Sequence, residues 1–428
     1  MFRVIHTFDQ DKYYLISLIL RANSTVLPPT AVYIHLPFCR RRCYYCDFPI
    51  AVVGDKGGSA ATWMIQEYLT ALIQDIQQTE PTGQSLKTIF FGGGTPSLLS
   101  AREIAQILTA IASQFDISSD AEISMEIDPG TFDREQLQGY LTAGVNRFSL
   151  GVQSFEPELL KICGRSHTIE DVFTAIETIR QLNINNFSLD LISGLPNQTP
   201  EACLRSLQTA IAIAPKHLSG YDLVLEPVTA FGKQYQPGAT PLPNDDDTAQ
   251  MYRLTQKTLT EAGYEHYEVS NYALPGYQCR HNRVYWENKP YYGFGMGAAS
   301  YVAGQRFTRP RTRQSYYQWL QEGAIIDTPV LTPTDYLLET LMLGLRLAEG
   351  IKTNQFDAEI WQQIWSCLQP YYRQGWIEIL DANSKLLDVT TGDRLSSSAK
   401  RIRLSDPEGF LFSNTILASL FEKLEIDY

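Results

Sequence analysis

Three cysteines in one short loop carry the strongest chemical signal in the sequence. Cys39, Cys43 and Cys46 lie in the run Y-I-H-L-P-F-C-R-R-R-C-Y-Y-C-D-F, residues 33–48, and form a C-x3-C-x2-C pattern. Cysteine thiolates hold iron–sulfur clusters, and a cubane cluster normally takes four of them. With only three close together, one iron would stay open to a further molecule, as open catalytic metal sites do. The arginines at 40–42 would favour thiolate over thiol.

Other uses of these cysteines are a disulfide pair, a zinc site with His35 as the fourth ligand, or incidental burial. The remaining cysteines, Cys163, Cys203, Cys279 and Cys367, have no spacing that indicates a disulfide framework. Disulfides are rare in reducing compartments. The cysteine usage therefore favours a cytoplasmic protein.

Composition excludes several classes of protein. The chain has 428 residues, of which 44% are hydrophobic and 19% charged, as in ordinary globular proteins. The net charge of −12 gives no electrostatic footprint for nucleic acid. The apolar run at 13–20 is too short to cross a bilayer, and the first residues lack a signal-peptide pattern. Peripheral membrane contact and a homodimer stay open.

The first half alternates between short apolar runs and helical patterns. Strands separated by helices of this length indicate repeated βαβ units and a parallel sheet. Six strands are too few for a closed eight-stranded barrel. Ser100 with Glu103 predicts a capping box at one helix start. The predicted strands are 31–36, 86–91, 121–127, 146–152, 187–192 and 216–225, and the helices between them are 60–78, 100–115, 133–143, 168–181 and 200–214.

The second half reads differently. A Pro- and Gly-rich loop at 226–247 precedes a helix at 247–263, and residues 264–310 are aromatic-rich and irregular. Helices are then predicted at 336–347 and 357–369, a hairpin from 376–380 and 385–389, and a final helix at 410–424. Helices followed by a hairpin predict a small, mostly α, winged-helix-like C-terminal domain.

Polar residues gather where the predicted parallel strands end. Ligands in open α/β folds bind at these carboxyl ends. The glycines of G-G-G-T-P could expose backbone groups to a polar ligand, or could make a plain tight turn. Each charged residue taken alone is more often an ordinary rim group. The set comprises Tyr33, Gly93, Gly94, Thr95, Glu126, Gln153, Arg165 and Asp190.

Taken together, the cysteine spacing and these segments resemble the radical S-adenosylmethionine (SAM) superfamily. The order and spacing are most similar to the branch of the oxygen-independent coproporphyrinogen oxidases and the HemW-type heme chaperones. The resemblance implies an α/β fold with a partial (β/α)6 barrel, a 4Fe–4S cluster on Cys39, Cys43 and Cys46, and SAM bound by the eight residues just named. It divides the chain into an N-terminal extension (1–30), the barrel (31–247), an aromatic-rich heme or substrate region (248–330) and a HemN-type C-terminal domain (331–428).

Two features distinguish the members of this branch. Phe48 stands where the oxidases place another cysteine. The run H-N-R-V-Y-W resembles a heme-binding motif, in which His281 with Asn282, Tyr285 and Trp286 would contact heme. An imidazole can ligate heme iron, and aromatic rings can cover the macrocycle. The alternatives for this run are a core-packed loop and ligation by Cys279.

The resemblance therefore predicts a radical SAM heme chaperone that delivers heme to acceptor apoproteins. The alternative is an oxygen-independent coproporphyrinogen III oxidase, so enzymatic activity is left open. A purely structural iron–sulfur protein is disfavoured, because it would have no use for the predicted SAM contacts.

Overall fold

The computed structural model describes residues 27–55, 59–81, 83–388 and 399–424. The apolar run at 13–20, and with it most of the predicted N-terminal extension, lies outside the described residues. In the described part of the chain, no helix is both long and apolar enough to cross a membrane.

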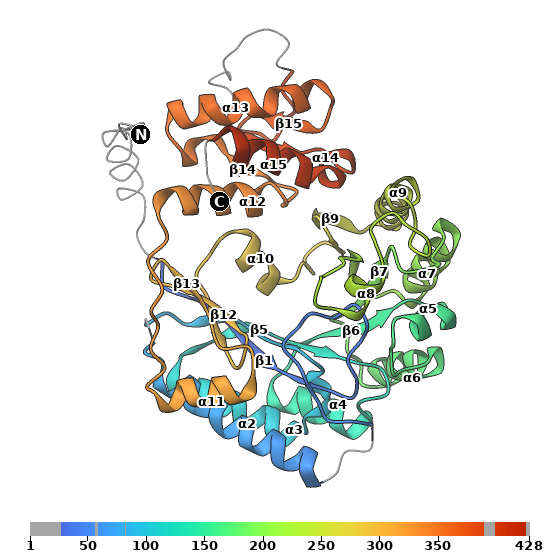
Figure 1. Ribbon diagram of the computed structural model, residues 1–428, viewed down its shortest axis with the longest axis vertical. Coiled ribbons are helices and arrows are strands. Elements are labelled where there is room, and N and C mark those ends of the chain that lie inside the picture. Colours follow the sequence, from blue (N-terminus) through green and yellow to red (C-terminus); the bar gives the residue numbers. More distant parts are fainter. Residues whose placement is uncertain (1–26, 56–58, 82, 389–398, 425–428) are drawn as a thin grey trace, which may run out of the picture.

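The core of the molecule is a sheet in which the six predicted strands pair in chain order, each parallel to the next. Figure 1 shows these strands in the lower part of the molecule, with helices along the outer side of the sheet. The predicted α/β fold with a partial (β/α)6 barrel is confirmed. The strands are β1 (Ala31–Leu36), β4 (Leu86–Gly93), β5 (Ile117–Ile127), β6 (Arg147–Gln153), β7 (Phe187–Ser193) and β8 (His217–Asp222).

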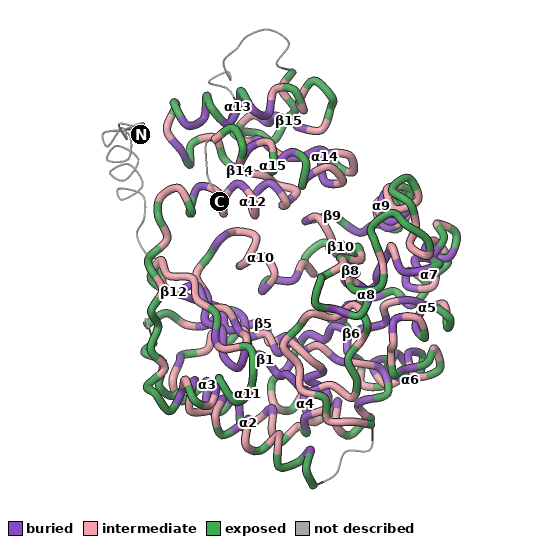
Figure 2. Tube along the Cα trace, in the orientation of Figure 1, coloured by how far each residue is buried: buried purple, intermediate pink, exposed green. Residues whose placement is uncertain are grey.

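The helices between these strands bury one apolar side against the sheet, so that burial alternates along the tube in Figure 2. Ser100 and Glu103 form the predicted capping box at the start of α3, and Thr168 and Asp171 form another at α6. Such boxes satisfy backbone N–H groups that a helix start leaves unpaired. The helices are α2 (Ser59–Gln78), α3 (Ala101–Gln114), α4 (Arg134–Ala143), α5 (Pro157–Ile162), α6 (Ile169–Gln181) and α7 (Pro200–Ile213).

The segment after the barrel is more regular than predicted. Residues 264–310 contain β11 (Tyr292–Phe294), which extends the sheet parallel to β1, and β10 (Asn271–Ala273) and β9 (Glu265–Glu268), which extend its other edge. These strands are too short to give a clear alternating pattern. The predicted loop at 226–247 also contains a short helix. The other elements here are α8 (Ala230–Gln234), α9 (Asp245–Glu261), α10 (Arg280–Trp286), β12 (Ala299–Val302), β13 (Gln305–Thr308) and α11 (Arg313–Gln321).

A smaller domain follows, at the top of Figure 1, and has an apolar cluster of its own around Ile364 and Trp365. It packs α12 (Pro333–Gly344), α13 (Ala358–Arg373) and α15 (Ser413–Lys423) with an antiparallel sheet of β14 (Ile351–Lys352), β16 (Arg401–Leu404) and β15 (Ile377–Leu380). These helices and the three-stranded sheet fit the predicted winged-helix-like domain.

The predicted hairpin is formed in part. Leu387 donates its N–H to the carbonyl of Ile379 at 2.8 Å and Leu386 bridges Leu380, but the main partner of β15 is β16, and residue 389 at the end of the predicted second strand lies outside the described residues. The predicted final helix divides at Phe412 into α14 (Glu408–Leu411) and α15.

Candidate functional site

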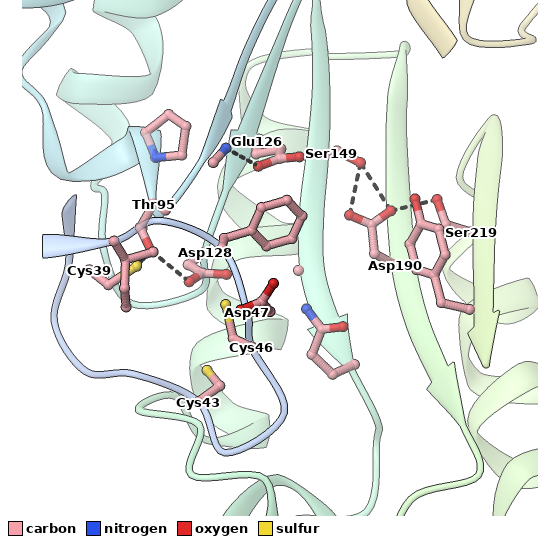
Figure 3. Close-up of a pocket in the computed structure, with 18 of the residues that line it drawn as sticks. Cys39, Cys43, Cys46, Asp47, Thr95, Glu126, Asp128, Ser149, Asp190 and Ser219 are labelled. Atoms are coloured by element: carbon pink, nitrogen blue, oxygen red, sulfur yellow. Dashed lines mark hydrogen bonds between the residues drawn. The ribbon is translucent and has the colours of Figure 1, made fainter. Parts of the chain in front are cut away.

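A cavity of about 960 Å³ opens beside the three cysteines and descends between the barrel strands. Figure 3 shows the cysteine loop at one side of this cavity and residues of β5, β6, β7 and β8 along the others. Its volume lies at the upper end of the range typical of small-molecule sites. Its wall is mostly apolar, but charged and polar side chains project from it at several points, a combination typical of small-molecule sites.

The cysteine loop is fixed by backbone hydrogen bonds. Val53 donates to the carbonyl of Cys39 at 2.9 Å, and Cys46 donates to the carbonyl of Cys43 at 3.2 Å. Tyr44 donates to the carbonyl of Cys163 at 3.0 Å, which ties the loop to the segment after α5. All three predicted ligand cysteines are half-buried and line the cavity. The structure thus brings the three thiols together on one wall.

Metal binding must bring these thiols to the thiolate form. Burial raises the pKa of Cys39 to about 12, although a hydrogen bond from Thr95 opposes the shift. Burial also raises the pKa of Cys46, and the charges of Arg42 and Arg165 oppose it. A bound metal deprotonates a ligating thiol. Without metal, Cys39 and Cys46 are therefore neutral at pH 7.

The arginines that were predicted to favour thiolates are mostly engaged elsewhere. Arg41 pairs with Asp55 at 2.7 Å, and Arg42 donates to the carbonyl of Cys46 at 3.2 Å. Arg165 instead donates from Nη1 to Sγ of Cys43 at 3.5 Å. Arg165 lies 122 residues after Cys43, so no local pattern in the sequence could predict this contact.

A single-ion site does not fit the loop. Among the residues that the structure describes, no three His, Cys, Asp or Glu side chains lie close enough to hold one metal ion. His35, the proposed fourth zinc ligand, is hydrogen-bonded through Nδ1 to Tyr33 at 3.0 Å and through Nε2 to the carbonyl of Pro49 at 2.8 Å. A cubane places each thiolate on a different iron and needs no such convergence. Three accessible thiols beside a guanidinium therefore fit a cluster better than zinc.

The glycine turn after β4 packs directly on the cysteine loop. Gly93 has φ +114°, and a Cβ added there would lie 2.5 Å from the His35 ring. A Cβ on Gly94 would lie 2.6 Å from the carbonyl oxygen of Phe38. Thr95 donates its N–H to that same oxygen at 2.7 Å. The turn therefore needs glycine both for its conformation and for close packing.

Two half-buried carboxyl groups lie in the cavity wall below the turn. Glu126 accepts a hydrogen bond from the N–H of Gly93 at 3.1 Å, and burial, followed by the charge of Asp190, raises its pKa to about 8. Asp190 accepts hydrogen bonds from Ser149 at 2.9 Å and Ser219 at 2.8 Å, both visible in Figure 3. Burial raises the pKa of Asp190, and these hydroxyls oppose the shift.

Asp128 was missed as a site residue. It forms an ion pair with Arg165, with a 2.5 Å separation, and accepts a hydrogen bond from Thr95 at 3.1 Å. Arg165 also donates to the carbonyl of Gly151 at 3.1 Å. One signal in the sequence could have identified Asp128: it lies two residues after Glu126, on the segment that leaves β5. Arg165 is therefore already paired with one carboxylate, and a ligand carboxylate would have to share it.

The remaining predicted SAM residues also lie in the wall. Tyr33 on β1 and Gln153 at the end of β6 line the cavity, and Gln153 has φ +67°. All eight residues predicted to contact SAM thus border one cavity, and Pro96 adds to its lining next to Thr95. Their contact with SAM stays a prediction.

His281, on α10, is buried in the cavity wall with both ring nitrogens engaged. Nδ1 is hydrogen-bonded to Oγ1 of Thr88 at 2.8 Å, and Nε2 to the hydroxyl of Tyr285 at 2.8 Å. Burial lowers the pKa of His281 to about 3, so the ring is neutral. To ligate heme iron it would have to release one partner. Its role as a heme ligand stays a prediction.

The other residues of the predicted heme motif are divided. Asn282 and Tyr285 line the cavity, whereas Trp286 lies outside the described cavity wall. Cys279 is fully buried, and its thiol contacts Oε1 of Glu122 at 3.7 Å. Phe48, which stands in place of the oxidases' cysteine, is 59% exposed at the mouth of the cavity.

Comparisons with known proteins agree with this geometry. The family model of the radical SAM superfamily matches residues 33–210, and that of the HemN C-terminal domain matches 331–411. Heme chaperone HemW of Synechocystis sp. is 48% identical over 95% of this chain and 100% of its own length. HemW of Escherichia coli is 38% identical over 78% of this chain and 86% of its own. Coproporphyrinogen III oxidase HemN of Escherichia coli shares the fold, with a TM-score of 0.76, 23% identity and coverage of 94% and 92% of the two chains.

Proposed function

Because the chain belongs to the heme chaperone HemW family of radical SAM proteins, we propose that it binds a 4Fe–4S cluster, SAM and heme, and delivers heme to acceptor apoproteins. The observation that carries the proposal is the set of three half-buried cysteines at the mouth of a cavity with charged and polar side chains in its wall, in a chain that matches a named HemW along its length. The absence of a disulfide framework supports delivery in a cytoplasmic setting.

Cys39, Cys43 and Cys46 would hold the cluster. When bound, the cluster supplies a redox centre with one iron open to the amine and carboxylate of SAM. The chain's own contribution is charge and shape. Arg165 offsets negative charge beside Cys43, and the glycine turn lets backbone approach closely from the opposite side.

SAM would lie between the cysteine loop and the ends of β4 to β7. Arg165 could share its guanidinium between Asp128 and the ligand carboxylate, since charge-assisted bonds to this group are strong. The raised pKa of Glu126 keeps this side chain largely protonated at neutral pH. It could still accept hydrogen bonds from ribose hydroxyls. Tyr33, Gln153 and Asp190 complete the wall on which the ligand would rest.

Heme would occupy the part of the cavity that SAM leaves, against Asn282 and Tyr285 on α10. The apolar side chain of Phe48 at the mouth could cover the macrocycle. The alternative function is oxygen-independent oxidation of coproporphyrinogen III. The fold accommodates both, but Phe48 occupies the place where the oxidases have a cysteine, and this favours the chaperone.

A turnover assay separates these two functions. The anaerobically reconstituted protein, given SAM, a reductant and coproporphyrinogen III, should form no more protoporphyrinogen than a matched Cys43→Ala sample, because the oxidases' additional cysteine is absent. Product is measured by porphyrin fluorescence after oxidation. Turnover that depends on both SAM and an intact cluster would instead make the protein an oxidase.

A further inference from the structure

A buried arginine at the floor of the cavity has no role in the proposed function. Arg147 is the first residue of β6, is only 2% exposed, and lines the cavity. Its Nε is buried without a hydrogen-bond partner, and the structure gives its guanidinium no hydrogen bond or ion pair with any described residue. A buried charge is normally paired, because leaving water without a partner is costly.

The nearest acidic groups are already engaged. Glu122 accepts hydrogen bonds from the N–H groups of Arg280 and His281, each at 3.1 Å. Asp190 is held by serine hydroxyls. Both carboxylates act on Arg147 through space, but neither lies within 4.0 Å as an ion pair. The guanidinium therefore keeps its donors unused.

The two histidines of the floor are hydrogen-bonded and neutral. His217 is hydrogen-bonded to Ser188 and Tyr267, both at 2.8 Å, and His281 is held as described above. Burial and the charge of Arg147 lower the pKa of both histidines. Arg147 is thus a fixed positive charge with unused donors, beside histidines that add no charge and carboxylates that other groups hold, so a negative group entering the cavity could bind it.

Arg147 lies deeper in the barrel than the end that carries the cysteine loop. Arg165 contacts the carbonyl of Gly151, four residues further along β6. At about 3.3 Å per residue, Arg147 lies roughly 13 Å below that contact. The single carboxylate of a SAM molecule bound at the cysteines could not also reach Arg147. A different ligand must supply the negative group.

We propose that Arg147 is the anchor for a carboxylate of the second ligand in the barrel. The class of ligand is a molecule with a carboxylate on a flexible arm, because a planar guanidinium with free donors matches a carboxylate in a two-bond fork. On the proposed function, which identifies that ligand as heme, the group is a heme propionate.

The test compares hemin with hemin dimethyl ester, whose propionates carry no charge, on the reconstituted full chain. The wild type should bind hemin roughly 10- to 100-fold more tightly than the ester, the ratio expected for one charge-assisted contact. Arg147→Met should bring that ratio close to one, and Arg147→Lys should keep part of it, since lysine retains the charge without the fork. An undiminished ratio in Arg147→Met would overturn the proposal.

Two further measurements check that the variant is folded and test Arg147 without heme. Thermal midpoints should show no loss for Arg147→Met, whereas Arg309→Met, which leaves the buried Asp75 unpaired, should show a large one. If the wild type binds neither hemin nor its ester, the proposed function is refuted. The carboxylate site at Arg147 is then tested separately with propionate ion. Sodium propionate should then raise the midpoint of the wild type above that in equal sodium chloride, and equal responses of wild type and Arg147→Met would refute the anchor.

Discussion

Replacing any one of Cys39, Cys43 and Cys46 by alanine should abolish cluster assembly, because two thiolates cannot hold a cubane. These three thiols share one wall of the cavity, and Arg165 contacts one of them. Iron and acid-labile sulfide, together with the broad iron–sulfur absorption, measure the loss after anaerobic reconstitution. The expected effect is complete rather than partial.

Cys163 is the most stringent control for this prediction. It is buried, its carbonyl accepts a hydrogen bond from the cysteine loop, and burial together with the neighbouring Cys43 raises the pKa of its thiol to about 12. Cys163→Ala and the more remote Cys203→Ala should both keep the cluster. A cluster that survives loss of any one of the three loop cysteines would refute the ligand assignment.

Arg165→Ala should weaken SAM binding roughly 10- to 100-fold, the equivalent of about 1.5–3 kcal/mol for a lost charge-assisted hydrogen bond. The structure adds a reason for the upper end of that range. Without Arg165, the carboxylate of Asp128 would remain beside the ligand and repel it. Calorimetry on reconstituted protein measures the affinity, and iron content shows whether the cluster is intact.

The variant Asp128→Asn separates the two contributions. Combined with Arg165→Ala, it should recover part of the affinity that Arg165→Ala loses, because it removes the unpaired negative charge. Asp190→Ala should also weaken binding, with the serines that now hold Asp190 left without their acceptor. Unchanged affinity in both Arg165→Ala and Asp190→Ala would show that these are rim residues without a ligand role.

Local signals in the sequence predicted most of the barrel. Apolar runs of strand length between amphipathic helices gave the six parallel strands, and the pair Ser100 and Glu103 marked a helix start that the structure confirms. Strands β9, β10 and β11 have four residues or fewer and are defined by their pairing with distant strands, which no local pattern reveals. Strand β16 was missed for the same reason, since its partner β15 lies more than twenty residues earlier.

The candidate site was predictable where a motif fixed it and not where folding did. The cysteine spacing located the loop, and the strand ends located Glu126 and Asp190. The partner of His281, Thr88, is 193 residues away in the chain, so its hydrogen bond could not be foreseen. The lack of a partner for Arg147 was equally unpredictable, because it depends on which groups the neighbouring carboxylates bind in the folded structure.

An equilibrium titration with hemin tests the proposed heme binding. Hemin is added to the reconstituted full chain under anaerobic conditions, and the Soret absorption is recorded at each step. We expect saturable binding of one heme per chain with a shifted Soret band. A linear, unsaturable response identical to that of hemin with a protein of no heme affinity would contradict it.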